Sequence, residues 1–180
     1  MDDPQLSAIY EVKQKMEEFF SREDVSIRVK ELGTEIAEFY KGSELTVIAL
    51  MNGGAFFACD LVREMDIPLY FDSMRISSYV HDQRTTDIKF SGELKLEVKN
   101  RHILIADDVF DSGETIRACK EYLLNCGALS VKSAVLVNKK VSDRNSEPDW
   151  ACFDSPDRYI VGFGLDSEEY YRNLPFIGCL

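Results

Sequence analysis

The sequence has little of what a membrane, secreted or nucleic-acid-binding protein needs. Its 180 residues contain no apolar run that approaches the roughly 20 residues of a membrane-spanning helix. The first ten residues carry two aspartates and a proline, where a signal peptide would have a basic and then an apolar start. Because 32 acidic residues outweigh 21 lysines and arginines, the net charge is −11, which disfavours binding to nucleic acid. We therefore expect a cytoplasmic protein with neither a membrane nor a nucleic-acid partner.

The sequence also lacks the cysteine and glycine patterns of several common sites. Neither a Walker A motif nor a GxGxxG fingerprint is present, and no repeat or low-complexity segment occurs. The length and the ordinary hydrophobic content of 45% favour one domain over residues 1–180. The five cysteines form no CxxC pair and no zinc-type spacing, and their odd number predicts reduced thiols: Cys59, Cys119, Cys126, Cys152 and Cys179.

The most informative stretch runs from His102 to Tyr122. A short apolar run, 103–106, predicts a buried strand, which is followed by a small-residue loop and by a helix that continues to Cys126. In open α/β sheets, a strand whose carboxyl end leads through such a loop into a helix is a common phosphate site. The first N–H groups of the helix lack intrahelical partners and lie at the positive end of its dipole, so they can bind an anion.

The side chains of this stretch supply the rest of a phosphate and metal site. Gly113 lets the backbone approach a ligand closely, and Ser112 and Thr115 add hydroxyl donors. Asp107 and Asp108 provide hard oxygen ligands that suit Mg2+, directly or through water. Together these residues indicate a site for a metal-bound sugar phosphate, with a plain acidic surface loop as the alternative.

The remaining segments predict further helices and strands. Apolar residues at helical spacing occur in residues 6–20, and again after Ser21–Asp24, which is typical of an N-cap with an acid three residues on. A second strand–glycine loop–helix unit runs from Leu45 to Leu61. Strands are also predicted at 69–74 and 131–137, an exposed antiparallel pair at 75–80 and 87–98, and a loop at 142–148.

Four separated motifs carry a family resemblance. Residues 103–115, ILIADDVFDSGET, resemble at every position the phosphoribosyl-pyrophosphate (PRPP) signature of the type I phosphoribosyltransferases. MNGGAFFACDL, from Met51, resembles the pyrophosphate loop of the hypoxanthine-guanine phosphoribosyltransferases, in which the peptide bond equivalent to Met51–Asn52 can be cis. MRISSYV, from Met74, resembles their flexible loop, and the tail from Asp149 resembles their carboxyl end almost residue for residue. The resemblance runs from about Ser21 to Leu180.

This resemblance implies a fold and an assembly. The fold class is α/β: a type I phosphoribosyltransferase fold with a mainly parallel central sheet flanked by helices, a small hood and a flexible lid. The lid would be the hairpin at about 75–98, and the hood would come from the N-terminal segment and the tail, about 150–180. A homodimer or homotetramer is expected from the same likeness.

The resemblance also implies a reaction in purine salvage. The 5-phosphoribosyl group of PRPP would pass to N9 of a 6-oxopurine, hypoxanthine and guanine, with Mg2+ as cofactor and with IMP or GMP and pyrophosphate as products. Asp111 would be the general base and acid at purine N7. The other implied residues are substrate-binding: Asp107, Asp108, Ser112, Gly113, Glu114, Thr115, Lys139, Tyr159, Ile160, Asp166, Arg172, Asn52, Gly53, Gly54, Ser78 and Tyr79.

Each of these implied roles follows from the matching motif. Lys139 would contact the 6-oxo group of the purine, Tyr159 would stack on its ring and the Ile160 backbone would read its edge. Arg172 would contact pyrophosphate. The metal ligands would be Asp107, Asp108 and Asp166, and Ser78 and Tyr79 would close over the site.

Three positions depart from the hypoxanthine enzymes and leave alternatives open. Many relatives have Glu at Asp107 and Lys at Asn52, and some have Lys at Ser77. The Asp107–Asp108 pair is shared with xanthine-preferring relatives, so the choice among the purine bases hypoxanthine, guanine and xanthine stays open. A non-catalytic regulator that senses PRPP or nucleotides on the same fold is a second hypothesis, which the acidic charge disfavours. A receiver domain is a third, disfavoured because its acidic pair lies near the amino terminus.

Overall fold

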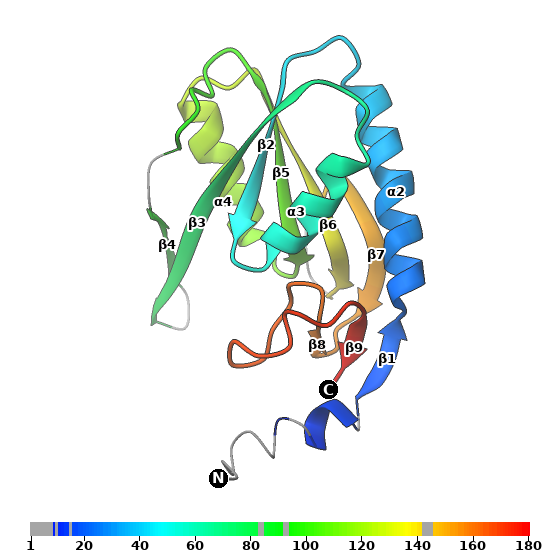
Figure 1. The fold of residues 1–180 in the computed structure, drawn as a ribbon. Coiled ribbons are helices and arrows are strands. Elements are labelled where there is room, and N and C mark those ends of the chain that lie inside the picture. Colours follow the sequence, from blue (N-terminus) through cyan, green and yellow to red (C-terminus); the bar gives the residue numbers. More distant parts are fainter. Residues whose placement is uncertain (1–8, 10, 15, 83–84, 92–93, 142–145) are drawn as a thin grey trace.

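The computed structural model describes residues 9, 11–14, 16–82, 85–91, 94–141 and 146–180, and for residues 77–82 and 85–91 it describes the backbone. A six-stranded sheet in the order β4-β3-β2-β5-β6-β7 forms its centre (Figure 1). Five neighbouring strands are parallel, and β4 is antiparallel at the edge. The strands are β2 Leu45–Met51, β3 Leu69–Asp82, β4 Thr85–Ser91, β5 His102–Phe110, β6 Ser130–Lys140 and β7 Trp150–Pro156.

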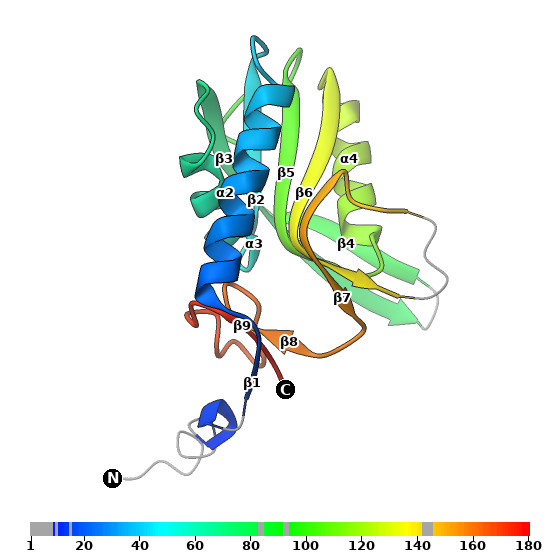
Figure 2. The same ribbon diagram turned by 90° about the vertical axis from the view of Figure 1, so that its right-hand side faces the viewer.

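Helices cover both faces of this sheet. Helices α2 (Arg22–Phe39) and α3 (Gly54–Arg63) lie on one face, and α4 (Glu114–Asn125) lies on the other (Figure 2). The predicted mainly parallel sheet flanked by helices is therefore confirmed. No helix in the part of the chain that the structure describes is long and apolar enough to cross a membrane.

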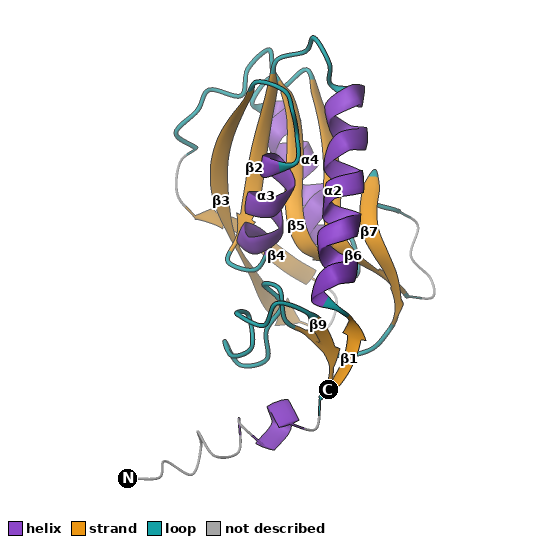
Figure 3. Cartoon of the chain, turned by 45° about the vertical axis from the view of Figure 1, so that its right-hand side comes forward, coloured by secondary structure: helices purple, strands orange, loops and turns teal. Residues whose placement is uncertain are grey.

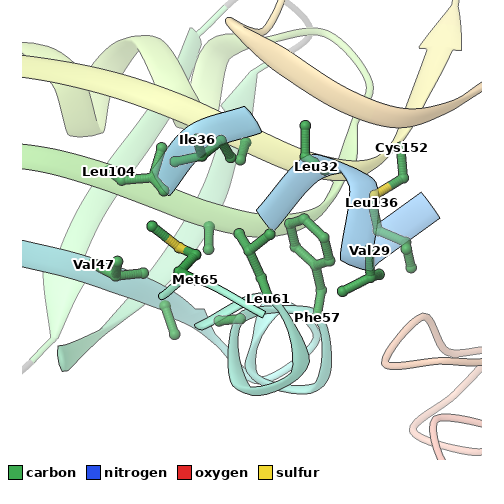
Figure 4. Close-up of a cluster of buried hydrophobic side chains, with 14 of the residues drawn as sticks. Val29, Leu32, Ile36, Val47, Phe57, Leu61, Met65, Leu104, Leu136 and Cys152 are labelled. Carbon is green, nitrogen blue, oxygen red and sulfur yellow. The ribbon is translucent and has the colours of Figure 1, made fainter. Parts of the chain in front are cut away.

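The side chains of β5 point alternately to the two faces of the sheet, so its apolar run contributes to two hydrophobic cores. Leu104 and Ala106 pack into the cluster beneath α2 and α3, whereas Ile103 and Ile105 pack into the cluster beneath α4, as the two-residue period of a strand requires. Figure 4 shows the first cluster, where the α2 side chains meet those of α3 over the strands. Helix α2 begins where predicted, with a complete capping box between Ser21 and Asp24.

A second, three-stranded sheet lies beyond the carboxyl ends of the central strands. Its order is β1-β9-β8, with β1 at Glu17–Phe20, β8 at Ile160–Val161 and β9 at Ile177–Cys179 (Figure 3). The helical prediction for residues 6–20 is therefore wrong at its carboxyl end, although residues 11–14 are helical. Pairing with β9 overrides the helical spacing, and Phe20 stacks on Phe153 at 4.1 Å between ring centroids.

Other predicted boundaries also shift: β4 ends earlier than expected, whereas β3, β5 and β6 continue past their apolar runs through sheet pairing. The two strands expected at 69–74 and 75–80 form one strand, β3, and its antiparallel partner β4 ends at Ser91 rather than at Val98. Strand β5 extends to Phe110, so Asp107 and Asp108 lie within a strand rather than in a loop. Strand β6 extends to Lys140 and therefore contains Lys139.

Candidate active site

The predicted site residues gather at the carboxyl edge of the central sheet. Strand β2 is flanked by β3 on one side and by β5 on the other, so the strand order reverses between β2 and β5. Ligands of open α/β sheets bind at such a reversal, outside the carboxyl ends of the strands. The loop after β2 carries Asn52 and Gly53, and the end of β5 carries Asp107 and Asp108.

Three segments far apart in sequence meet at Gly53. A Cβ atom added to Gly53 would lie 1.7 Å from Asp108 Oδ2 and 3.3 Å from Arg172 Nη1, so the loop, β5 and the tail are in contact there. Gly54 also packs closely on β5, since its added Cβ would lie 2.9 Å from Asp107 Cα. Glycine is required at both positions by the close approach, because any side chain would displace a carboxylate or the backbone.

Hydrogen bonds of Arg172 fix the turn of the tail that lies against the same loop. Its Nη1 donates to the Gly164 carbonyl at 2.7 Å, and its Nη2 pairs with Asp166 Oδ1 at 2.8 Å and with Glu169 Oε2 at 3.1 Å. Gly164 has φ +103°, and its added Cβ would lie 2.2 Å from the Gly53 carbonyl oxygen. Arg172 and Asp166 thus reach the loop through one turn of the tail, Gly162–Leu165, in which Gly162 and Leu165 pair as an isolated bridge.

The two adjacent carboxylates of β5 are electrostatically unfavourable neighbours. Burial raises the pKa of Asp107 well above its ordinary value, and the charge of Asp108 raises it further. Burial also raises the pKa of Asp108, although hydrogen bonds and the Arg172 guanidinium oppose this shift. A cation or hydroxyl donors placed beside the pair would compensate the buried negative charge.

The loop between β5 and α4 has the geometry of an anion site. Gly113 has φ +81°, and its added Cβ would lie 2.7 Å from the Phe110 ring, so neither the backbone angle nor the space admits a side chain. Helix α4 begins at Glu114, whose N–H donates weakly to Ser112 Oγ at 3.3 Å. Glu114 is exposed and Thr115 is half-buried, so the acid of the first turn faces solvent.

A lysine and a carboxylate lie beside this loop. Lys139 Nζ is 3.6 Å from Asp111 Oδ2 and 3.9 Å from Asp157 Oδ1, and the lysine side chain is only 14% exposed. Tyr159 is 55% exposed, so its ring is available for stacking. Ile160 is buried in β8, where it pairs with Cys179, and its backbone position is fixed by that sheet.

The remaining predicted residues lie on the loop after β2 and on the hairpin of β3 and β4. The peptide bond between Met51 and Asn52 is cis, as the resemblance suggested. Asn52 accepts a hydrogen bond of 3.0 Å from Arg75 Nη2. Ser78 and Tyr79 belong to β3, opposite Ile88 and Asp87 of β4, and their side chains lie outside the described part of the structure.

Two charged residues at this edge were not singled out in the sequence. Arg75 stands opposite Met51, the last residue of β2, in the parallel register of β2 and β3, although β3 itself continues to Asp82. Asp157 directly follows β7, the partner of β6. In both cases the signal was available, because the carboxyl ends of adjacent parallel strands meet at one edge of the sheet.

Fold and site together define an open α/β protein with glycine-containing loops at the carboxyl ends of β2 and β5, where its strand order reverses. The chain belongs to the phosphoribosyltransferase family, since residues 16–168 match the phosphoribosyl transferase domain.

Three named proteins show which members of the family this chain resembles. The hypoxanthine-guanine phosphoribosyltransferase of Lactococcus lactis is 36% identical over 162 residues, which is 89% of this chain and 88% of the relative. The crystal structure of a hypoxanthine phosphoribosyltransferase from Staphylococcus aureus is 31% identical, with a TM-score of 0.85 over 91% of this chain and 90% of that one. A hypoxanthine-guanine-xanthine phosphoribosyltransferase structure is 30% identical, with a TM-score of 0.80 over 91% and 95% of the two chains.

Proposed function

We propose that the protein is a purine-salvage enzyme that transfers the 5-phosphoribosyl group of PRPP to N9 of a 6-oxopurine and releases pyrophosphate. The observation that carries the proposal is the meeting of Gly53, Asp108 and Arg172 at the strand reversal. This places a loop of backbone donors, a carboxylate and a guanidinium around one point. The printed names of the relatives support hypoxanthine and guanine as the bases.

The mouth of α4 would hold the 5-phosphate of PRPP. The backbone N–H groups of the Asp111–Thr115 loop, together with the hydroxyls of Ser112 and Thr115, are suited to a dianion. Asp107 and Asp108 would lie under the ribose diol and accept hydrogen bonds from its hydroxyl groups. Arg172 and the backbone amides at Gly53 and Gly54 would stabilise the charge that grows on the departing pyrophosphate.

The donor set at this edge fits Mg2+. Asp107, Asp108 and Asp166 offer hard oxygen ligands, and Mg2+ characteristically binds through one or two carboxylates together with substrate phosphates. Across the described ranges, no group of three or more His, Cys, Asp or Glu side chains converges on one point, so PRPP would have to complete the coordination. When bound, the ion would neutralise negative charge on the pyrophosphate group.

On the purine side, Lys139 would donate to the 6-oxo group. An adenine 6-amino group in that position would place a donor against a donor, which disfavours adenine. Asp111 would accept the proton from purine N7 as the bond to N9 forms, and Tyr159 would stack on the ring. The Ile160 backbone, fixed in β8, would read the ring edge.

The same proposal extends to the surroundings of the site. We infer that the hairpin at about 75–98 acts as a lid, with Ser78 and Tyr79 closing over PRPP, and that the tail and the N-terminal segment form a hood. A cytosolic homodimer or homotetramer is proposed from the likeness to the relatives. All five cysteines are free thiols, which agrees with a reducing compartment.

A pyrophosphate-release assay tests the function directly. Purified protein with PRPP and Mg2+ should form the nucleotide from hypoxanthine or guanine. It should lose this activity in excess EDTA, and it should not convert adenine. Turnover with xanthine far above hypoxanthine would favour the xanthine-preferring alternative; the name of one relative includes xanthine beside hypoxanthine and guanine. No turnover with any 6-oxopurine would refute the enzyme and favour a nucleotide-sensing regulator.

A further inference from the structure

The ammonium group of Lys139 lies between two carboxylates. Asp111 approaches it from the loop after β5, at 3.6 Å, and Asp157 approaches it from the segment after β7, at 3.9 Å. The lysine is 14% exposed, whereas the two aspartate side chains are 55% and 64% exposed. Lys139 is therefore a largely enclosed cation with counter-ions on two sides.

The nearest cations in sequence are engaged with other acids. Lys140 follows Lys139 in β6 and so points to the opposite face of the sheet, where it pairs with Glu147 at 3.2 Å and with Asp154 at 3.3 Å. Arg158, next to Asp157, pairs with Glu17 of β1 at 3.7 Å. Asp111 and Asp157 thus place two carboxylates beside the ammonium group of Lys139.

This charge matters for the choice between purines. Hypoxanthine and guanine are neutral near neutral pH, whereas xanthine, with its additional 2-oxo group, loses a proton in that range. A carboxylate beside Lys139 repels the xanthine anion, while a neutral 6-oxopurine can still accept a hydrogen bond from Lys139.

We propose that Asp157 is a specificity-determining residue that makes this subsite select neutral 6-oxopurines against the xanthine anion. The inference rests on the proposed function, because it assigns the base to Lys139. Asp111 is required for proton transfer in that function, so Asp157 is the carboxylate whose charge serves selection alone.

The test compares two aspartates that differ in the face they occupy. Asp157→Asn removes the charge beside Lys139, and Asp154→Asn removes the same charge beside Lys140 on the other face. Values of kcat/KM for xanthine and for hypoxanthine are measured at pH values on both sides of the first ionisation of xanthine. Thermal unfolding of each variant shows whether it is folded.

In the wild-type protein, kcat/KM for xanthine should be at least about tenfold lower than kcat/KM for hypoxanthine. The ratio of the xanthine value to the hypoxanthine value should fall as the pH rises. Asp157→Asn should raise the xanthine-to-hypoxanthine ratio about two- to fivefold above the ionisation of xanthine, the size expected for one partly exposed charge. Asp157→Glu, which keeps the charge, should leave the ratio low, and Asp154→Asn should not change it.

Two outcomes would overturn the inference while leaving the proposed function intact. One is a wild-type protein that uses xanthine as well as hypoxanthine at every pH. The other is an Asp157→Asn variant whose ratio equals that of the wild type or of Asp154→Asn. Failure of the proposed function would look different, since no base would then be converted.

Discussion

Replacing Gly53 with alanine isolates the contact on which the site depends. The Gly53 backbone has φ −61° and ψ −50°, which alanine adopts without strain. The substitution therefore acts through space alone. The new Cβ would lie 1.7 Å from Asp108 Oδ2 and 2.6 Å from its Cγ, so either the carboxylate or the loop must retreat by more than about 1 Å.

The size of the effect follows from what can move. A carboxylate at the end of a side chain yields more easily than backbone, so the cost in folding should stay within the roughly 1–3 kcal/mol of local overpacking. The effect on the reaction rate should be larger than the effect on stability, because a displacement of about 1 Å among substrate-binding groups can reduce the rate about a hundredfold. We expect kcat/KM for PRPP to fall ten- to a hundredfold while the protein remains folded.

A double-mutant cycle separates this mechanism from general damage. Nucleotide formation is measured for Gly53→Ala, for Asp108→Ala and for the double variant. In the Asp108→Ala background the clashing carboxylate is absent, so Gly53→Ala should cost much less there than it does in the wild type. Gly42→Ala is a matched control, since its φ is +78° and nothing lies within 4 Å of its added Cβ. It should reduce stability without changing kcat/KM.

Two results would refute the reasoning about Gly53. Wild-type kcat/KM in Gly53→Ala would mean that the loop and Asp108 do not need their close approach for turnover. An equal loss in both backgrounds would mean that alanine disturbs the loop by another route than the carboxylate.

Three further predictions concern proton transfer by Asp111, the loop between β5 and α4, and the stability of the fold. Asp111→Asn should lower kcat about ten- to a thousandfold with little change in PRPP affinity, and unchanged turnover would remove Asp111 from proton transfer. Gly113→Ala should raise the KM for PRPP about tenfold or more, because its φ of +81° and the nearby Phe110 ring oppose a side chain. A normal KM would contradict the assignment of the 5-phosphate to this loop. Partial burial raises the pKa of Asp149, but hydrogen bonds from Lys120 and Lys132 outweigh it and lower the pKa from 3.8 to about 2. Because the folded-state pKa is the lower one, this stabilisation of about 2 kcal/mol is present above about pH 4 and lost as the pH falls toward 2. Urea unfolding across that range should show the loss in the wild type and not in Asp149→Asn.

The strand–loop–helix units were predictable from the sequence because their signals are local. A β-branched apolar run followed by small residues and then helix formers gave β2 with α3 and β5 with α4. The ends of the strands were less predictable. Asp107 pairs with Val135 and Phe110 pairs with Asn138, so β5 continues through polar residues that the apolar pattern excluded. Strand length was decided by the neighbouring strand rather than by the sequence of β5.

The contacts between motifs could not be predicted from local sequence patterns, because they join segments that are distant in sequence; only the family resemblance brought the N-terminal segment and the tail together. Nothing near Gly53 indicates that Asp108 and Arg172 will lie against it, and nothing near Glu17 indicates that its segment will pair with Cys179. Helical spacing of apolar residues was a reasonable guide for residues 6–20, but hydrogen bonds to a strand at the other end of the chain outweighed it.

These long-range contacts explain why the two ends of the chain are parts of one site. Strand β9 pairs with β8 on one side and with β1 on the other, so the β8–β9 pair joins the two ends of the segment 162–176 and the N-terminal strand supports β9. That segment carries Arg172, which donates to the Gly164 carbonyl, and Gly164 in turn lies directly against the Gly53 carbonyl. The position of the guanidinium beside Asp108 therefore depends on a small sheet that contains none of the charged groups of the site. A chain that begins at residue 21 would keep every residue assigned to PRPP. It would lose β1, the strand that anchors β9, and we expect Arg172 to lose its orientation as a result.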